Sequence, residues 1–135
     1  SNLRAMRLKT LAWLALLSFA FHLTWELAQS PLYTCSIDMN RCFWICVHAT
    51  FGDVGIMLVL YAIHQKVPSL WKMALIGNAF ALVIEKISIE LERWTYLPSM
   101  PLIPGIEVGI TPILQMALIP PLVFYILRIQ YPQKP

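Results

Sequence analysis

The stretch 11-LAWLALLSFAFHLTWELAQS-30 decides the fold of this chain. Its length matches the roughly 20 mostly apolar residues that a helix needs to cross the hydrocarbon core of a bilayer. Three further windows share this character, so the sequence predicts helices over residues 11–30, 43–63, 73–94 and 108–129. We therefore expect an all-α fold in which residues 1–135 form a single domain, a polytopic membrane protein built as a four-transmembrane-helix bundle.

The composition favours the same fold. Hydrophobic residues make up 59% of the 135 residues and charged residues only 13%, whereas a soluble domain usually carries about 25% charged residues. The net charge is +3, but the cations form no stripe with aromatic residues, so we expect no nucleic-acid partner. A soluble bundle with an all-apolar interior is the alternative, and apolar residues on nearly every predicted helix face speak against it.

The beginning of the chain invites two other interpretations. Residues 1–5 have the character of a cloning remnant in front of a native Met6, and we expect no function of them. The first apolar window follows three cations, as in a signal peptide. It lacks a small-residue cleavage site, however, and contains His22 and Glu26, which are foreign to signal peptides, so a membrane helix is expected.

The Lys and Arg residues predict the orientation of the bundle. Seven of them lie at the two ends of the chain and in the loop after the second helix: Arg4, Arg7, Lys9, Lys66, Lys72, Arg128 and Lys134. Arg41 and Arg93 are the only clear cations on the other side, and Lys86 lies inside the third predicted helix. Because cytoplasmic loops carry the excess of cations, both termini are expected in the cytoplasm, with the chain in a bacterial inner membrane or its equivalent. Aromatic residues are expected as a belt at the outer interface, at Tyr33, Trp44, Trp94 and Tyr96.

The three cysteines lie close together in the sequence. Cys35 and Cys42 fall in or beside the first outer loop, which faces an oxidising space in most cells. A disulfide between them is one expectation and two free thiols are the other. Cys46 is expected as a small packed residue, because its spacing to the other two matches no standard zinc site.

Polar side chains are concentrated in the outer half of the predicted bundle. A charged side chain at membrane depth costs at least ~2.5–3.5 kcal/mol, so these residues are candidates for function. His22, Glu26 and Gln29 share one helix face because they are four and three residues apart. His48 and Asp53 are five residues apart, so only one of them can point straight at the centre. The sequence thus predicts a pocket that opens outward or sideways into the outer leaflet.

A histidine beside a carboxylate in such a pocket can transfer protons near neutral pH. The candidate catalytic residues are His22 and Glu26 first, followed by Asp53, Glu85 and His48. The candidate substrate-binding residues are Trp25, Gln29, Asn78, Thr111 and Gln115. Structural interpretations stay open for each, above all an ion-paired surface stripe for Lys86, Glu90 and Arg93. We expect no metal and no cofactor, although the same side chains also suit a divalent cation.

Two segments carry a family resemblance. The stretch 21-FHLTWE-26, followed by Leu32 and Tyr33, resembles a helix of the sterol isomerase and sigma-2 receptor group, the EXPERA family. The stretch 43-FWICVH-48 is similar to the start of the next helix in that family, where the isomerases have Glu in place of His48. The resemblance implies a four-helix sterol-binding fold, with His22 and Glu26 as acid–base residues and Gln115 as a polar residue of the last helix.

A second resemblance is local. The stretch 93-RWTY-96, followed by a proline-rich turn, is similar to small lycopene-cyclase subunits, whose paired acidic residues before the last helix are missing here. Both resemblances favour an isoprenoid or sterol-like substrate.

Three functions follow from these observations. The first is an intramembrane enzyme that acts on a hydrophobic isoprenoid, sterol-like or lipid substrate by acid–base isomerisation or cyclisation. The second is a non-enzymatic subunit that binds a lipophilic ligand or pigment, as a homo-oligomer or within a larger complex. The third is a small proton- or metal-coupled transporter. The expected partners are a lipophilic small molecule or lipid and the membrane itself.

Overall fold

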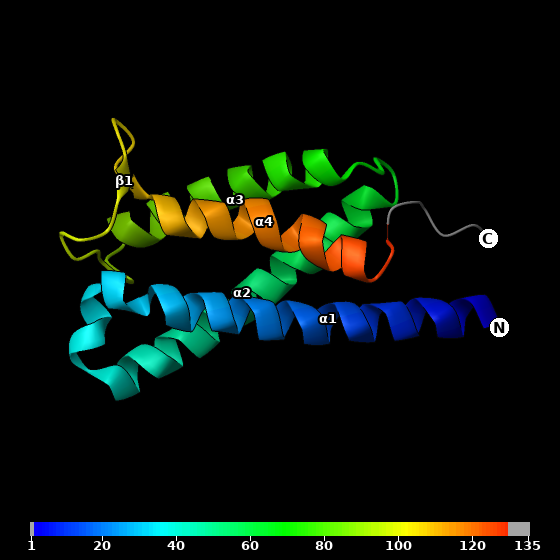
Figure 1. Cartoon of the computed structure of the whole chain (residues 1–135), viewed down its shortest axis with the longest axis horizontal. Helices are drawn as coiled ribbons and strands as arrows, with labels where there is room; N and C mark the ends of the chain where they lie inside the picture. Colours follow the sequence, from blue (N-terminus) through cyan, green and yellow to red (C-terminus); the bar gives the residue numbers. More distant parts are fainter. Residues whose placement is uncertain (1, 130–135) are drawn as a thin grey trace.

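The computed structural model describes residues 2–129, so Ser1 and residues 130–135, which include Lys134 of the orientation count, lie outside it. The described chain is mostly helical, and its four α-helices are α1 (Asn2–Gln29), α2 (Met39–His64), α3 (Leu70–Glu90) and α4 (Ile110–Ile126). Figure 1 shows the helices along one long axis, with α2 inclined across the bundle. The start of α1 and the end of α4 lie at the same end of the molecule (Figure 1).

Local sequence signals set the helix ends. Asp38 begins α2 by accepting a hydrogen bond from the backbone N–H of Arg41, at 3.3 Å. Ser69 begins α3 in the same way, since each side chain supplies an acceptor for an N–H that has no partner within the helix. Helix α3 ends at Glu90 rather than at Trp94, because Glu92 adopts a left-handed conformation with φ 55°.

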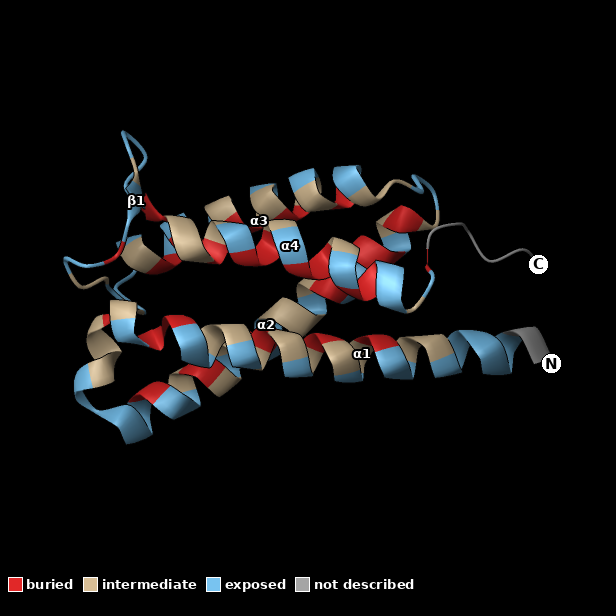
Figure 2. Cartoon of the chain, in the orientation of Figure 1, coloured by how far each residue is buried: buried red, intermediate tan, exposed pale blue. Residues whose placement is uncertain are grey.

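Two of the described helices are long and apolar enough to cross a membrane. They cover Arg4–Leu32 and Met39–His64, with mean hydropathies of 1.4 and 1.8. The fourth helix, Ile110–Ile126, is apolar but shorter. Large hydrophobic side chains are exposed on all four helices, for example Trp13, Phe51, Val83 and Leu118. Figure 2 shows exposed residues on the outer faces of the helices and buried residues where the helices meet.

Helices α3 and α4 are in close backbone contact at Gly77. A Cβ atom at this position would lie 2.7 Å from the backbone oxygen of Met116, whereas real contacts of this kind stay beyond 3.0 Å. The contact is with backbone and not with a movable side chain. Glycine is therefore required here for the two helices to pack as they do.

We expect Gly77→Ala to lower the free energy of unfolding by about 1–3 kcal/mol, the usual cost of overpacking a close contact. The measurement is reversible unfolding in mild detergent. Gly55→Ala is the matched control, because Gly55 lies in α2 and its added Cβ would meet nothing within 4 Å. Alanine there should leave stability unchanged or raise it slightly. Equal losses in both variants would show that the close approach does not limit packing.

The two loops at the far end from the termini are joined to each other. We call residues 30–38 and 91–109 together the cap. Tyr33 and Tyr96 form an isolated β-bridge, with backbone hydrogen bonds from Thr34 to Thr95 (3.0 Å) and from Leu97 to the Leu32 carbonyl (2.8 Å). The cap also contains the short strands β1 (Leu102–Ile103) and β2 (Val108–Gly109) and the 3-10 turns η1 (Ser30–Leu32) and η2 (Thr34–Ile37). A disulfide between Cys35 and Cys42 ties it to the first turn of α2.

Candidate functional site

A cavity of about 560 Å³ lies beneath the cap, with walls from all four helices. Its size is in the range of small-molecule sites in proteins. Most of the wall is apolar, from residues such as Ile45, Ile56, Ile84 and Met116. Six of the predicted site residues also line it: Glu26, Gln29, His48, Asp53, Glu85 and Gln115.

The amide of Gln115 connects the two carboxyl groups of the deeper wall. Its Nε2 lies 3.0 Å from Asp53 Oδ2, 3.2 Å from Glu26 Oε1 and 2.8 Å from His22 Nδ1. One amide nitrogen therefore lies within hydrogen-bond distance of both carboxyl groups, which brings Glu26 and Asp53 close together in the cavity wall.

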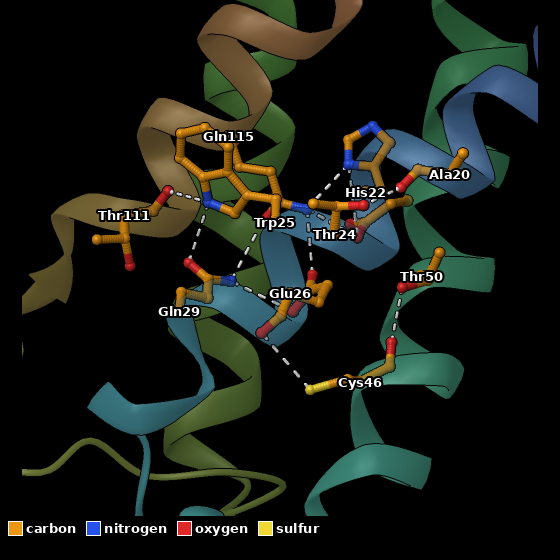
Figure 3. A network of polar contacts seen from close by, with 11 residues as sticks. Ala20, His22, Thr24, Trp25, Glu26, Gln29, Cys46, Thr50, Thr111 and Gln115 are labelled. Atoms are coloured by element: carbon orange, nitrogen blue, oxygen red, sulfur yellow. Dashed lines mark hydrogen bonds and ion pairs between the residues drawn. The ribbon is translucent and has the colours of Figure 1, made fainter.

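A second glutamine and a tryptophan hold Glu26 and Gln115 in place. Gln29 Nε2 lies 3.2 Å from Glu26 Oε2 and 3.3 Å from Gln115 Oε1. The Trp25 indole N–H is shared between Gln29 Oε1 at 3.2 Å and the Thr111 carbonyl at 3.1 Å. Figure 3 shows these side chains converging from α1 and α4. Trp25 and Thr111 therefore support the site from behind, and neither lines the cavity.

Glu85 forms a separate polar centre in the wall, directly beneath the cap. Its Oε1 accepts three hydrogen bonds, from Tyr33 Oη at 2.9 Å, Tyr96 Oη at 2.8 Å and Trp94 Nε1 at 3.1 Å. Tyr33 and Tyr96 are themselves the two residues of the β-bridge, and Tyr96 Oη also accepts from the Gly109 N–H. Glu85 thus anchors both halves of the cap to α3.

Burial raises the pKa of the Tyr33 and Tyr96 hydroxyls well above their ordinary value, and the charge of Glu85 raises them further. Both hydroxyls therefore stay protonated and remain donors at neutral pH. A raised pKa of an acid means that the folded state resists its ionisation. The stability contributed by these bonds is complete below the ordinary pKa of 10.0 and is lost as the pH rises above it.

We expect the melting temperature of the wild type in detergent to fall steeply above a pH of about 10. The double variant Tyr33→Phe/Tyr96→Phe is expected to have a lower melting temperature at neutral pH. Its melting temperature should also fall less as the pH rises above that value. Circular dichroism at increasing pH measures both. Identical alkaline profiles for the two proteins would mean that these hydroxyls do not hold the cap.

Four predicted site residues lie outside the cavity wall. Besides Trp25 and Thr111, His22 and Asn78 are not among the lining residues. His22 is fully buried behind Gln115, and within residues 2–129 no partner reaches its Nε2. Since Nδ1 faces the Gln115 amide, His22 is a positioning residue for this amide rather than a group that meets a ligand.

The polar ends of three aromatic residues have a role that the sequence pattern does not reveal. The sequence predicts Tyr33, Trp94 and Tyr96 in an outer interfacial belt, but in the structure their donor groups are hydrogen-bonded to Glu85. Trp44, by contrast, is 62% exposed, as a belt residue would be. The available signal was Glu85 in the last part of a predicted apolar helix, followed by Trp94 and Tyr96. A carboxylate that is buried in such a helix needs hydrogen-bond donors nearby.

The remaining predicted charges have surface roles. Lys86 and Glu90 form an exposed i, i+4 ion pair at 3.5 Å, and Lys86 also donates to the Ile106 carbonyl at 3.1 Å. Arg93 lies with its guanidinium 5.5 Å from the centre of the Trp94 ring and lines the cavity. His48 is exposed at the cavity rim. No three His, Cys, Asp or Glu side chains of residues 2–129 are grouped closely enough to hold a metal ion.

Comparison with known proteins adds no relative. No protein-family model matches the chain, and no curated protein and no solved structure matches it.

Proposed function

We propose that this chain is an integral membrane protein whose four helices all cross the bilayer, with both termini in the cytoplasm and the cap outside. Polar side chains gather inside the bundle while large apolar side chains face outward on every helix. A monomeric soluble protein rarely exposes so much contiguous apolar surface. Helix α3, with 21 residues, is about 31 Å long at 1.5 Å per residue, close to the thickness of the hydrocarbon core.

Within this membrane protein, we propose an enzyme that moves protons on a hydrophobic isoprenoid, sterol-like or lipid substrate. The carboxyl groups of Glu26 and Asp53, bridged by the Gln115 amide at the wall of an apolar cavity, carry the proposal. A lipophilic molecule can reach such a cavity from the bilayer. In this proposal the two carboxyl groups share one proton, so the molecule meets an acid and a base at the same wall of the cavity.

Double-bond isomerisation needs no reactant other than this pair of carboxyl groups. The protonated carboxyl group donates its proton to one carbon of the double bond, and the π electrons form the new C–H bond. The carboxylate then removes a proton from the carbon next to the resulting cation, and the C–H electrons become the new π bond. The pair ends with one proton, as it began, so no cofactor is consumed. Cyclisation uses the same two steps, with a second double bond attacking the cation in between.

The EXPERA-like motif supports part of this assignment. It implied His22 and Glu26 as the acid–base residues, and Glu26 does line the cavity. His22 lies behind Gln115, so we assign the second proton-transfer role to Asp53. His22 then keeps the Gln115 amide turned toward both carboxyl groups.

Exchange with solvent tests the enzyme hypothesis whatever the structure of the product. The protein would be placed in nanodiscs in D₂O with a monounsaturated sterol or with lycopene, and the recovered lipid analysed by mass spectrometry. Turnover through the carboxyl pair leaves deuterium on carbon, because the pair exchanges its proton with solvent between cycles. A substrate recovered without deuterium from both incubations would argue against the enzyme.

One observation favours the non-enzymatic alternative, a binding protein for a lipophilic ligand. Both oxygens of Glu26 already have amide donors, from Gln115 and Gln29. A fully satisfied carboxylate is a rigid recognition element. A lipid that remains bound in native mass spectrometry but gains no deuterium would support this function.

A further inference from the structure

The two oxygens of Glu85 have different surroundings. Oε1 accepts all three hydrogen bonds, and all three donors come from the cap. No donor within residues 2–129 reaches Oε2. This oxygen keeps some accessible surface, since it is absent from the fully buried polar atoms that have no hydrogen-bond partner. The residue as a whole is only 6% exposed and lines the cavity. The open side of Oε2 therefore faces the cavity.

This oxygen is a fixed hydrogen-bond acceptor in an apolar surrounding. The three donors on Oε1 prevent the carboxylate from turning, so Oε2 keeps one direction. A ligand gains most here from a hydrogen-bond donor, because a carbonyl or ether oxygen would face the carboxylate without a proton between them.

The neighbouring charge selects among possible donors. Arg93 lines the same cavity, beside Trp94, and carries a permanent positive charge. An ammonium group at Glu85 would share the cavity with that cation, whereas a hydroxyl group carries no charge for the cation to repel. A phosphate group, in turn, would face the carboxyl groups of Glu26, Asp53 and Glu85. The surroundings of Oε2 thus fit a neutral donor.

We propose that the cavity recognises a lipid alcohol, whose hydroxyl group donates to Glu85 Oε2 while its apolar body fills the rest of the cavity. This inference rests on the proposed lipophilic ligand but not on proton transfer by Glu26 and Asp53. A binding measurement can therefore test it separately from turnover.

The test compares cholestanol, cholestanone and 3-aminocholestane as competitors of radiolabelled cholestanol on protein in nanodiscs. The wild type should bind the alcohol about tenfold more tightly than the ketone, in line with one hydrogen bond to a charged group. The amine should also bind more weakly than the alcohol. Equal binding of alcohol and ketone, or tightest binding of the amine, would overturn the proposal.

The substitution Glu85→Gln sharpens the test. The Tyr33, Trp94 and Tyr96 donors hold the amide oxygen at the Oε1 position, so the amide NH₂ group must face the cavity. The preference should then reverse, with the ketone bound more tightly than the alcohol. A simple loss of folding would weaken the binding of both ligands equally. An unchanged preference for the alcohol would overturn the assignment to Glu85.

Glu26→Gln separates this inference from the proposed enzyme. It should keep the wild-type preference for the alcohol while losing deuterium incorporation. Loss of the preference in Glu26→Gln, with the Glu85→Gln protein unaltered, would place the hydroxyl group at the carboxyl pair instead and contradict the proposal.

Discussion

Glu26→Gln and Asp53→Asn are each expected to lower the rate of deuterium incorporation by about 10²-fold or more. Each variant replaces one member of the carboxyl pair with an amide, which can neither donate an acidic proton nor accept one at neutral pH. Positioned acid–base groups typically contribute 10²–10⁴-fold to a rate. The measurement is the initial rate of label uptake by mass spectrometry, at equal amounts of folded protein.

Glu90→Gln is the matched control for this pair. It removes a carboxylate of the same length from the exposed ion pair with Lys86, outside the cavity. Its rate should equal that of the wild type. Full activity in either Glu26→Gln or Asp53→Asn would show that the carboxyl pair does not carry out the chemistry.

The second large effect concerns stability. Glu85→Ala is expected to lower the free energy of unfolding by roughly 3 kcal/mol or more, because it leaves three donors without their shared acceptor at ~1 kcal/mol or more each. Tyr33, Trp94 and Tyr96 would lose the contact that holds the cap to α3. Chemical unfolding in detergent, together with hydrogen exchange of the cap amides, measures the loss.

Two variants bracket this expectation. Glu85→Gln keeps one oxygen for the three donors and should recover most of the stability. Glu90→Ala removes an exposed glutamate, 68% accessible at its side chain, and should change stability by no more than a few tenths of a kcal/mol. If Glu85→Ala unfolds no more easily than Glu90→Ala, the cap is held by other contacts.

The predicted positions of the helices agree with the structure more closely than the predicted roles of single residues. Each of the four predicted windows overlaps one helix, because long apolar runs identify such segments strongly. The observed helix ends differ from the predicted ones where local residues decide where a helix begins or ends. Helix α1 begins at Asn2, before residue 11, because the polar residues between them are good helix formers with no glycine or proline.

The polar face of α1 shows how far sequence spacing can predict a site. His22, Glu26 and Gln29 were expected to face one pocket together. Glu26 and Gln29 do line the cavity, but His22 lies one helical turn deeper, behind the Gln115 side chain of α4. Spacing along a helix gives the face of a residue. It does not give the depth at which a neighbouring helix closes the cavity.

The anchoring of the cap depends on contacts that are distant in sequence. Tyr33 and Tyr96 meet through a β-bridge across 62 intervening residues, and both reach a carboxylate of α3. Neither apolar periodicity nor loop composition specifies this pairing. The asymmetric surroundings of Glu85 Oε1 and Oε2 therefore became visible only in three dimensions.

Infrared spectroscopy of the carboxyl groups tests the central claim most directly. The claim is that Glu26 and Asp53 share one proton in the cavity at neutral pH. The wild type in lipid should show the C=O stretching band of a protonated carboxyl group, shifted in D₂O, and the band should disappear or move in both Glu26→Gln and Asp53→Asn but not in Glu90→Gln. A wild-type spectrum without that band, or a band unchanged in both variants, would contradict the account.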